Sequence, residues 1–267
     1  PPGPAYCAAM ARIDLGSRHL DATLQDGVLR VVIDRPARRN ACTIEMYHGI
    51  KQAAVRADRD PAIDVLVLTG RGDVFCVGGE MGGEPGGGAG FDRDTDGLDL
   101  LPFRALEDSR AIVVCAINGL CQGGGLNLAL CSDIALAAAS ATFRAPELLR
   151  GVADPFLPAR LPARVGTAMA RYLLFTGAVI DAVAAERIGL VARVVPDADL
   201  PAAVTTVIEQ VRATAPAARA AVQHEMNRHL PPFHAVMCAA SLRGPEVAEG
   251  FQAFVEKRPP RWPRAGG

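Results

Sequence analysis

The sequence predicts an α/β fold in which apolar strands alternate with helices, followed by a helical C-terminal part. Apolar runs at 65–68, 112–117 and 134–137 are separated by helical or loop segments, and from about Leu157 the pattern changes to helices. Continuous apolar strands between helices indicate a sheet that is buried on both faces. Half of the 267 residues are apolar, so the chain can bury a large core.

A β-hairpin is expected before the first helix. Apolar and polar residues alternate from 20 to 24, Asp26-Gly27 supplies a tight turn, and residues 28–33 run back. Thr43 is then expected to cap a helix that continues to about Ala57.

The C-terminal part is expected to hold one short strand and several helices. The strand covers 191–195, and the clearest helices cover roughly 202–213, 217–229 and 245–257. Residues 82–97 are rich in glycine and aspartate and are typical of a mobile surface loop.

The charge balance gives no electrostatic footprint for nucleic acid or for an anionic membrane. The chain has 28 basic and 29 acidic side chains and a formal net charge of −1. No apolar stretch reaches the ~18 residues that a membrane span requires. The seven cysteines include no C-x-x-C pair and no zinc-like grouping with histidine, so reduced thiols in a cytoplasm are expected. Neither nucleic acid nor a membrane is therefore an expected partner.

Motifs for metals and for nucleotide cofactors are incomplete. Asp92, Asp94, Asp96 and Gly97 imitate the first half of a calcium-binding loop, but the twelfth position, which requires an acid, is Phe103. No strand–G-x-G-x-x-G–helix unit and no G-x-S-x-G turn occurs. No metal and no redox cofactor is expected.

Two glycine-bearing turns each follow an apolar, strand-like run. They are Val77-Gly78-Gly79-Glu80 and Gly123-Gly124-Gly125, and Pro146-Glu147 follows further along the chain. Glycine allows the main chain to approach a ligand closely, so the two turns can aim two backbone N–H groups at one carbonyl oxygen. A carboxylate beside that oxygen can move protons. This combination suits a reaction in which an enolate forms.

The order and spacing of these motifs resemble the crotonase superfamily, which includes enoyl-CoA hydratases and isomerases. The resemblance is carried by the runs 75–80, 117–125, 131–134 and 143–151, and by matches at 35–41, 176–191 and 249–258. It implies a crotonase-like ββα spiral. The expected division is a loosely ordered leader at 1–18, a spiral core at 19–200, and a helical region at 201–267 that serves trimerisation and contacts with coenzyme A.

The resemblance also implies roles for particular residues. The N–H groups of Gly79 and Gly124 would form an oxyanion hole for an acyl-CoA thioester, with Glu147 as the acid/base. Fixed donors of this kind are each worth roughly 10²–10³ in rate.

Coenzyme A is implied only as part of the substrate thioester. Its adenine and pantetheine arm would lie along Arg38 and the strand Cys76, Val77 and Gly78. Lys257 matches a family lysine that reaches a CoA phosphate from a neighbouring subunit. The implied assembly is a homo-oligomer, either a trimer or a dimer of trimers.

The reaction class depends on the number of carboxylates. Hydratases of the family use two glutamates, but the first of these positions is Asn127, whose amide can orient water and cannot accept a proton at neutral pH. A single Glu147 followed by Pro155-Phe156 is more similar to the Δ3,Δ2-enoyl-CoA isomerases. Glu147 would then remove a proton from C2 of a 3-enoyl thioester and return it at C4.

Two alternatives remain open. An enoyl-CoA hydratase could use Glu147 together with Asn127 or Asp154, although an aspartate before a proline is more often a turn cap than an acid/base. A non-catalytic acyl-CoA-binding protein would keep the pocket without the chemistry.

Overall fold

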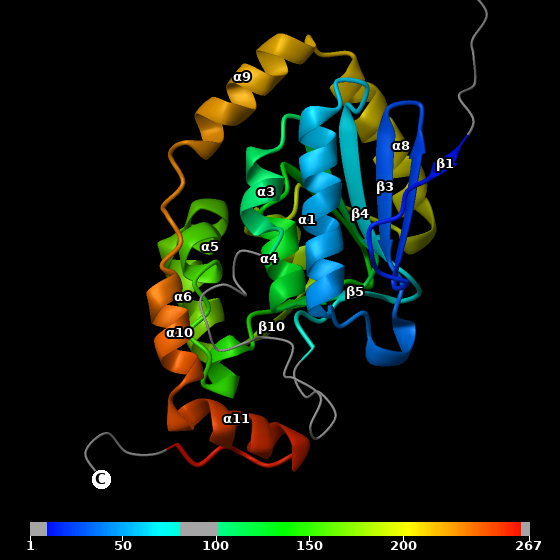
Figure 1. Ribbon diagram of the computed structural model, residues 1–267. Coiled ribbons are helices and arrows are strands. Elements are labelled where there is room, and N and C mark those ends of the chain that lie inside the picture. Colours follow the sequence, from blue (N-terminus) through cyan, green and yellow to red (C-terminus); the bar gives the residue numbers. More distant parts are fainter. Residues whose placement is uncertain (1–9, 81–100, 263–267) are drawn as a thin grey trace, which may run out of the picture.

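The computed structural model describes residues 10–80 and 101–262 (Figure 1). The first nine residues of the expected leader and the expected surface loop at 82–97 lie outside the described residues. Within the described part, two sheets and the helices around them form the mixed α/β architecture that the sequence predicts.

The larger sheet has seven strands in the order β1-β2-β3-β4-β6-β8-β11. Their bounds are β1 Ala11–Arg12, β2 Leu20–Gln25, β3 Val28–Ile33, β4 Val65–Gly70, β6 Ile112–Ile117, β8 Ile134–Ala138 and β11 Arg193–Val195. Strands β1 to β3 pair antiparallel, and β3, β4, β6, β8 and β11 pair in parallel. The expected hairpin is confirmed, and Asp26 and Gly27 both have positive φ in its two-residue turn. Strand β1 lies within the segment that was expected to be a loose leader.

The smaller sheet has the order β10-β9-β7-β5. Its strands are β5 Val74–Cys76, β7 Leu120–Gln122, β9 Thr142–Arg144 and β10 Val179–Asp181. Along the chain, β4 is followed by β5, β6 by β7, and β8 by β9, so that each successive pair adds one strand to each sheet. This repetition winds the chain into a spiral of ββα turns.

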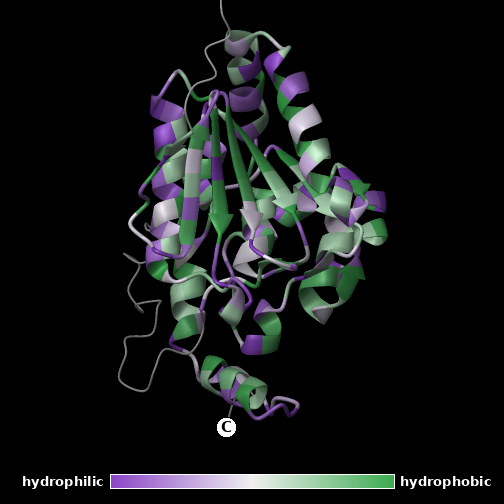
Figure 2. Ribbon diagram, turned by 90° about the vertical axis from the view of Figure 1, so that its right-hand side faces the viewer, coloured by the Kyte–Doolittle hydropathy of each residue, from purple (hydrophilic) through white to green (hydrophobic). Residues whose placement is uncertain are grey.

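Both faces of the larger sheet are buried, as the apolar strands predict. In β4, Val65 and Val67 belong to a hydrophobic cluster with α8 (Leu200–Arg212), whereas Leu66 and Leu68 belong to a cluster with α1 (Ile44–Arg59). Successive residues of a strand point to opposite faces, so a continuous apolar run is needed where both faces are covered. Figure 2 shows these central strands as largely hydrophobic.

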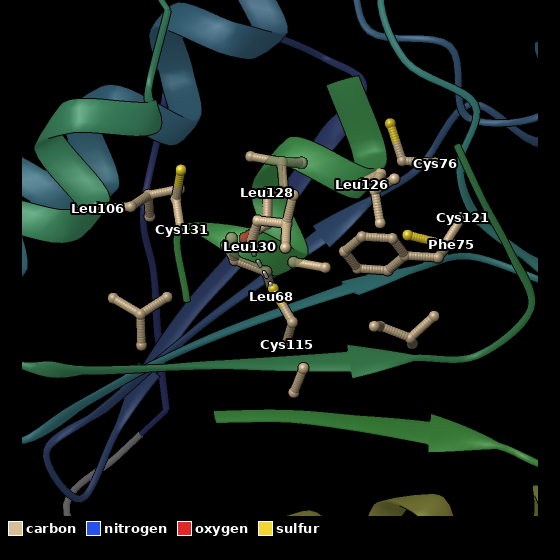
Figure 3. Packing of buried hydrophobic residues seen from close by; sticks show 14 of the residues in the cluster. Leu68, Phe75, Cys76, Leu106, Cys115, Cys121, Leu126, Leu128, Leu130 and Cys131 are labelled. Carbon is tan, nitrogen blue, oxygen red and sulfur yellow. Dashed lines mark hydrogen bonds between the residues drawn. The ribbon is translucent and has the colours of Figure 1, made fainter. Parts of the chain in front are cut away.

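Helix α1 begins where the sequence predicts. Thr43 is its N-cap, and the hydroxyl of Thr43 accepts a hydrogen bond from the N–H of Met46 at 3.3 Å. Helix α4 (Gly124–Leu130) begins at the second glycine turn, and its residues Leu126, Leu128 and Leu130 are buried near Leu68 and Phe75 (Figure 3). This packing fixes the position of the second glycine turn.

The remaining helices lie mostly in the C-terminal half. They are α3 Phe103–Asp108, α5 Leu157–Val165, α6 Thr167–Thr176, α7 Ala182–Arg187, α9 Pro216–Asn227, α10 Ala235–Leu242 and α11 Pro245–Val255, with short 3₁₀ helices η1 Pro36–Arg38, η2 Glu147–Arg150 and η3 Asp197–Asp199. The three clearest predicted helices are confirmed as α8, α9 and α11, with ends that differ by at most two residues. Helix α10 was not expected.

Two features are absent from the part of the chain that the structure describes. Residues 10–80 and 101–262 contain no helix that is both long and apolar enough to cross a bilayer. They also contain no cluster of three or more histidine, cysteine or acidic side chains that could hold a metal ion. The six cysteines in this part are buried and free.

Candidate active site

A cavity of about 320 Å³ gathers most of the residues that the sequence predicts. Its lining includes Arg38, Val77, Gly78, Gly79, Gly124, Asn127, Glu147 and Asp154. Cys76 is fully buried, and its thiol accepts a hydrogen bond from the N–H of Gly78 at 3.3 Å, so it supports the turn from behind rather than lining the cavity. Lys257 is exposed just beyond α11 and does not line this cavity.

The first glycine turn leaves β5 and is held by Cys42. The N–H of Cys42 donates to the carbonyl of Gly78, and the N–H of Glu80 donates to the carbonyl of Cys42, both at 2.8 Å. Gly78 has a φ of +97°, which a residue with a side chain rarely adopts. Among hydrogen bonds between described residues, none uses the N–H of Gly79.

The second turn leads into α4. Gly123 has a φ of +58°, and its carbonyl accepts the N–H of Asn127 at 3.0 Å. Gly124 is the first residue of the helix, where the backbone N–H has no partner within the helix. No acceptor in the described residues takes this N–H either. The two turns therefore each present one unpaired backbone donor beside the same cavity.

Tyr47 explains why residue 124 is a glycine. A Cβ added to Gly124 would lie 2.0 Å from the phenolic oxygen of Tyr47, which is fully buried on α1. Sequence reasoning missed Tyr47 as a lining residue. Its position in the first turn of an apolar helix face gives no sign that its hydroxyl end reaches the cavity.

Glu147 is the first residue of η2, directly after Pro146. Its Oε2 is buried and has no hydrogen-bond partner among the described residues, although the residue as a whole is only partly buried. Burial, and secondly the nearby Asp154 carboxyl, raise the pKa of Glu147 to about 8. Strongly shifted carboxyl groups in a cavity are typical of catalytic acids and bases.

Asp154 and Asn127 form a bonded pair in the same cavity. Oδ1 of Asp154 accepts the N–H groups of Phe156 at 2.8 Å and Leu157 at 2.7 Å, and Oδ2 accepts Nδ2 of Asn127 at 3.2 Å. Asp154 is thus a turn cap that also lines the cavity. Burial raises the pKa of Asp154, against the lowering effect of these three donors.

The bond to Asp154 orients the amide of Asn127. Asn127 is almost fully buried, and its Oδ1 has no partner within the described residues. The amide nitrogen must face the Asp154 carboxylate, which can only accept a hydrogen bond from it. The amide oxygen therefore points away from Asp154 and has no hydrogen-bond partner in the described part of the chain. The cavity lining therefore has two buried acceptors without partners among the described residues, Oδ1 of Asn127 and Oε2 of Glu147.

Two further charged residues beside Glu147 were not singled out from the sequence. Glu80 lines the cavity but is paired with Arg35 at 2.8 Å. Arg150 also lines the cavity and lies over the ring of Phe254, with 3.9 Å from its guanidinium carbon to the ring centroid.

The C-terminal helices close one wall of the cavity. Cys238 and Leu242 come from α10, and Phe251 and Phe254 come from α11, which lies at the lower edge of Figure 1. Sequence reasoning assigned this region to assembly and to contacts with coenzyme A, and missed these four residues. Apolar residues on C-terminal helices give no indication of which surface they cover.

Comparisons with known proteins agree with this geometry. Residues 23–265 match the family described as enoyl-CoA hydratase/isomerase. Crotonyl-CoA hydratase of Syntrophomonas wolfei is 34% identical over 236 residues, covering 85% of this chain and 90% of that protein. Carnitinyl-CoA dehydratase of Proteus mirabilis is 31% identical over 260 residues, covering 92% and 98%.

Solved structures support the same conclusion for the fold. The crystal structure of enoyl-CoA hydratase/isomerase from Pseudoalteromonas atlantica T6c superposes with a TM-score of 0.80 at 29% identity, covering 92% of this chain and 100% of that one. This similarity confirms the predicted crotonase-like spiral and its helical C-terminal region. The chain belongs to the enoyl-CoA hydratase/isomerase family of the crotonase superfamily, whose members act on acyl-CoA thioesters.

Proposed function

We propose that this enzyme isomerises an unsaturated acyl-CoA, with Glu147 as its single acid/base. The observation that carries the proposal is the buried, unpaired Oε2 of Glu147 in the cavity that both glycine turns line. The N–H groups of Gly79 and Gly124 would hold the thioester oxygen as it gains negative charge. A base with a pKa near the working pH can both take and return a proton.

The other carboxyl groups that line the cavity support a single acid/base. Both oxygens of Asp154 accept hydrogen bonds from the protein, and Glu80 is paired with Arg35. Among the described lining residues, Glu147 is the carboxyl group with a buried oxygen that has no hydrogen-bond partner. In the proposed reaction, Glu147 takes the proton from C2, the C3=C4 π electrons of the dienolate pick up a proton at C4 from the same carboxyl group, and a C2=C3 double bond remains.

Substrate binding follows from the same cavity. The exposed Arg38 would contact the phosphates of coenzyme A, and Val77 and Gly78 would line its pantetheine arm. No metal and no redox cofactor takes part in this scheme, because the proton is moved by a carboxyl group and the charge is held by backbone N–H groups.

The test compares two substrates. The protein is incubated with a 3-enoyl-CoA and with crotonyl-CoA, and the conjugated thioester absorbance is followed. An isomerase gains absorbance with the first and leaves the second almost unchanged. Glu147→Gln should abolish the gain while CoA binding persists, and Glu209→Gln, an exposed glutamate on α8, serves as the matched control. Full activity of Glu147→Gln would refute the proposal. Absence of turnover by the wild type with both substrates, with CoA binding retained, would favour a non-catalytic acyl-CoA-binding protein.

Hydration is a second candidate, favoured by one specific observation. Oδ1 of Asn127 and Oε2 of Glu147 are two buried acceptors without partners in the described residues. One water molecule could donate to both. Glu147 could then take its proton as the water oxygen attacks C3, and the resulting enolate could take that proton from Glu147 at C2. The hydratase names of several relatives agree with this candidate. Loss of conjugated absorbance with crotonyl-CoA would select it over isomerisation.

The proposed assembly is a homotrimer or a dimer of trimers. Phe175 on α6 and Val183 on α7 are 71% and 56% exposed, and Tyr172 and Val179 nearby are also exposed. Large exposed apolar side chains within one short stretch of the chain are candidates for an interface. Lys257 would reach a CoA phosphate from the neighbouring subunit. Light scattering on the purified protein measures the mass, and a monomer at micromolar concentration would contradict this proposal.

A further inference from the structure

Arg150 shares the cavity with Glu147 and projects from the same short helix. Both residues belong to η2, in which positions three apart lie above one another. Arg150 is partly buried, whereas Arg38, the other arginine of the lining, is exposed. The two arginines therefore lie at different depths, and Arg150 is the one beside the acid/base.

The charge of Arg150 lacks an acidic partner in the described residues. Its Nη1 donates to the carbonyl of Leu149 at 3.2 Å, and its guanidinium stacks on Phe254 at 3.9 Å. A guanidinium has five N–H donors, so most of its capacity is unused. Burial lowers the pKa of Arg150, and the neighbouring cation Arg144 adds to this effect.

Some other arginines with buried or partly buried side chains are paired with acids, whereas Arg144 and Arg164 donate to backbone carbonyls. Arg35 forms an ion pair with Glu80, and Arg160 forms one with Glu107. Buried cations in proteins are normally matched by an acid, because removing an unpaired charge from water is costly. Glu147 is the acid that interacts electrostatically with Arg150, but its raised pKa keeps it largely uncharged at neutral pH.

We infer that Arg150 binds a carboxylate carried by the acyl part of the substrate, so that the enzyme prefers enoyl-CoA thioesters with a second acid group. This inference rests on the proposed function, since Glu147 defines where the reacting carbons lie. An anion held by Arg150 lies beside those carbons, while the exposed Arg38 remains for the phosphates. A guanidinium binds a carboxylate through two parallel hydrogen bonds, which also orients the chain.

A purely structural role for Arg150 makes a different prediction. Helix α11 packs directly on η2, because a Cβ added to Gly250 would lie 2.5 Å from the carbonyl carbon of Arg150. The Arg150–Phe254 stack could simply hold α11 in place. In that case removing either partner would affect every substrate alike.

The experiment measures kcat/KM for two 3-enoyl-CoA substrates of equal chain length, one neutral and one with a terminal carboxylate. Arg150→Gln should lower the ratio of carboxylated to neutral kcat/KM roughly 10- to 100-fold, the effect of losing a hydrogen-bonded charge pair. Arg150→Lys keeps the charge and should retain a preference for the acid. Phe254→Leu removes the stack alone and should leave the ratio within about threefold of wild type.

The same substrates as pantetheine thioesters distinguish the two sources of an anion. If Arg150 binds the acyl carboxylate, the change in ratio persists without the CoA phosphates. The inference is overturned if Arg150→Gln lowers both substrates equally, if its effect disappears with the pantetheine thioesters, or if Phe254→Leu reproduces it. Failure of the proposed function is seen separately, as turnover that survives in Glu147→Gln.

Discussion

Gly78 and Gly124 approach so closely that a Cβ on Gly78 would lie 2.8 Å from the backbone nitrogen of Gly124. The two residues come from different turns of the spiral, and their contact sets the spacing of the unpaired N–H groups of Gly79 and Gly124. Glycine is required at both positions, since the phenolic oxygen of Tyr47 fills the space beside Gly124.

Gly78→Ala should inactivate the enzyme. The new methyl group displaces the Gly124 N–H, and the loss of one aligned donor costs roughly 10²–10³ in kcat. Gly72→Ala is the matched control, because Gly72 also has positive φ (+79°) but has nothing within 4 Å of an added Cβ. It should lose some stability through backbone strain and keep its kcat. Similar kcat values for the two variants would show that the contact between the turns is unimportant.

The rate should depend on the ionisation of Glu147. The pKa of Glu147 is raised to about 8, so its basic form increases as pH rises, and kcat/KM should climb to a plateau above about pH 8. Asp154 contributes to the raised pKa, and Asp154→Asn should move this rise to lower pH. A pH profile that is flat from 6 to 9 would contradict the assignment.

The ionisation of Glu147 should also affect folding stability, with the opposite dependence on pH. Between its ordinary pKa of 4.5 and about 8, Glu147 holds a proton in the folded state and has lost it in the unfolded state. The folded state then binds more protons, so this group makes the free energy of unfolding fall as pH rises through that window. Glu147→Gln should flatten the decline in urea unfolding between pH 5 and 8. An unchanged slope in that variant would count against a buried, proton-holding Glu147.

Asp154→Asn should also reverse the amide of Asn127. An asparagine at 154 presents an amide in place of the acceptor Oδ2, so Asn127 is expected to turn its oxygen toward it and its nitrogen toward the cavity. A water between Asn127 and Glu147 would then meet a donor where it had an acceptor. Any hydration of crotonyl-CoA should fall more than isomerisation does, measured on both substrates with one preparation.

The buried pair of Arg160 and Glu107 should matter for folding rather than for chemistry. Their side chains are 6% and 8% exposed, and Arg160 also donates to the carbonyl of Pro231 and lies over Phe233. Arg160→Met leaves Glu107 buried without its partner and should cost about 3–5 kcal/mol in urea unfolding.

Arg104→Met is the control for this measurement. It breaks an ion pair with Asp108 whose side chains are 79% and 67% exposed, and exposed pairs contribute less than about 1 kcal/mol. Equal losses of unfolding free energy in the two variants would show that burial does not account for the stabilising effect of the Arg160–Glu107 pair.

Much of the fold was predictable because its rules are local. The turn at Asp26-Gly27, the cap at Thr43 and the start of α4 at Gly124 each depend on residues within a few positions of one another. The two glycine turns and Glu147 were predictable from their residue types. Glycine permits close approach of the backbone to a ligand, and a glutamate can exchange a proton. Helix α10 was missed because its eight residues are nearly all apolar and show no clear periodicity.

The sequence alone therefore determined the strands, the turns, the family and the candidate acid. Only the tertiary structure decided which residues contact one another. Asp154 accepts hydrogen bonds from Asn127 and from two backbone N–H groups. Tyr47 lies against Gly124, and residues of α10 and α11 line the cavity together with Arg150. The physical reason is the distance along the chain between the residues that determine each property. Backbone conformation responds to neighbouring residues, whereas burial, pairing and pKa depend on groups that come together only when segments far apart in the chain pack against each other.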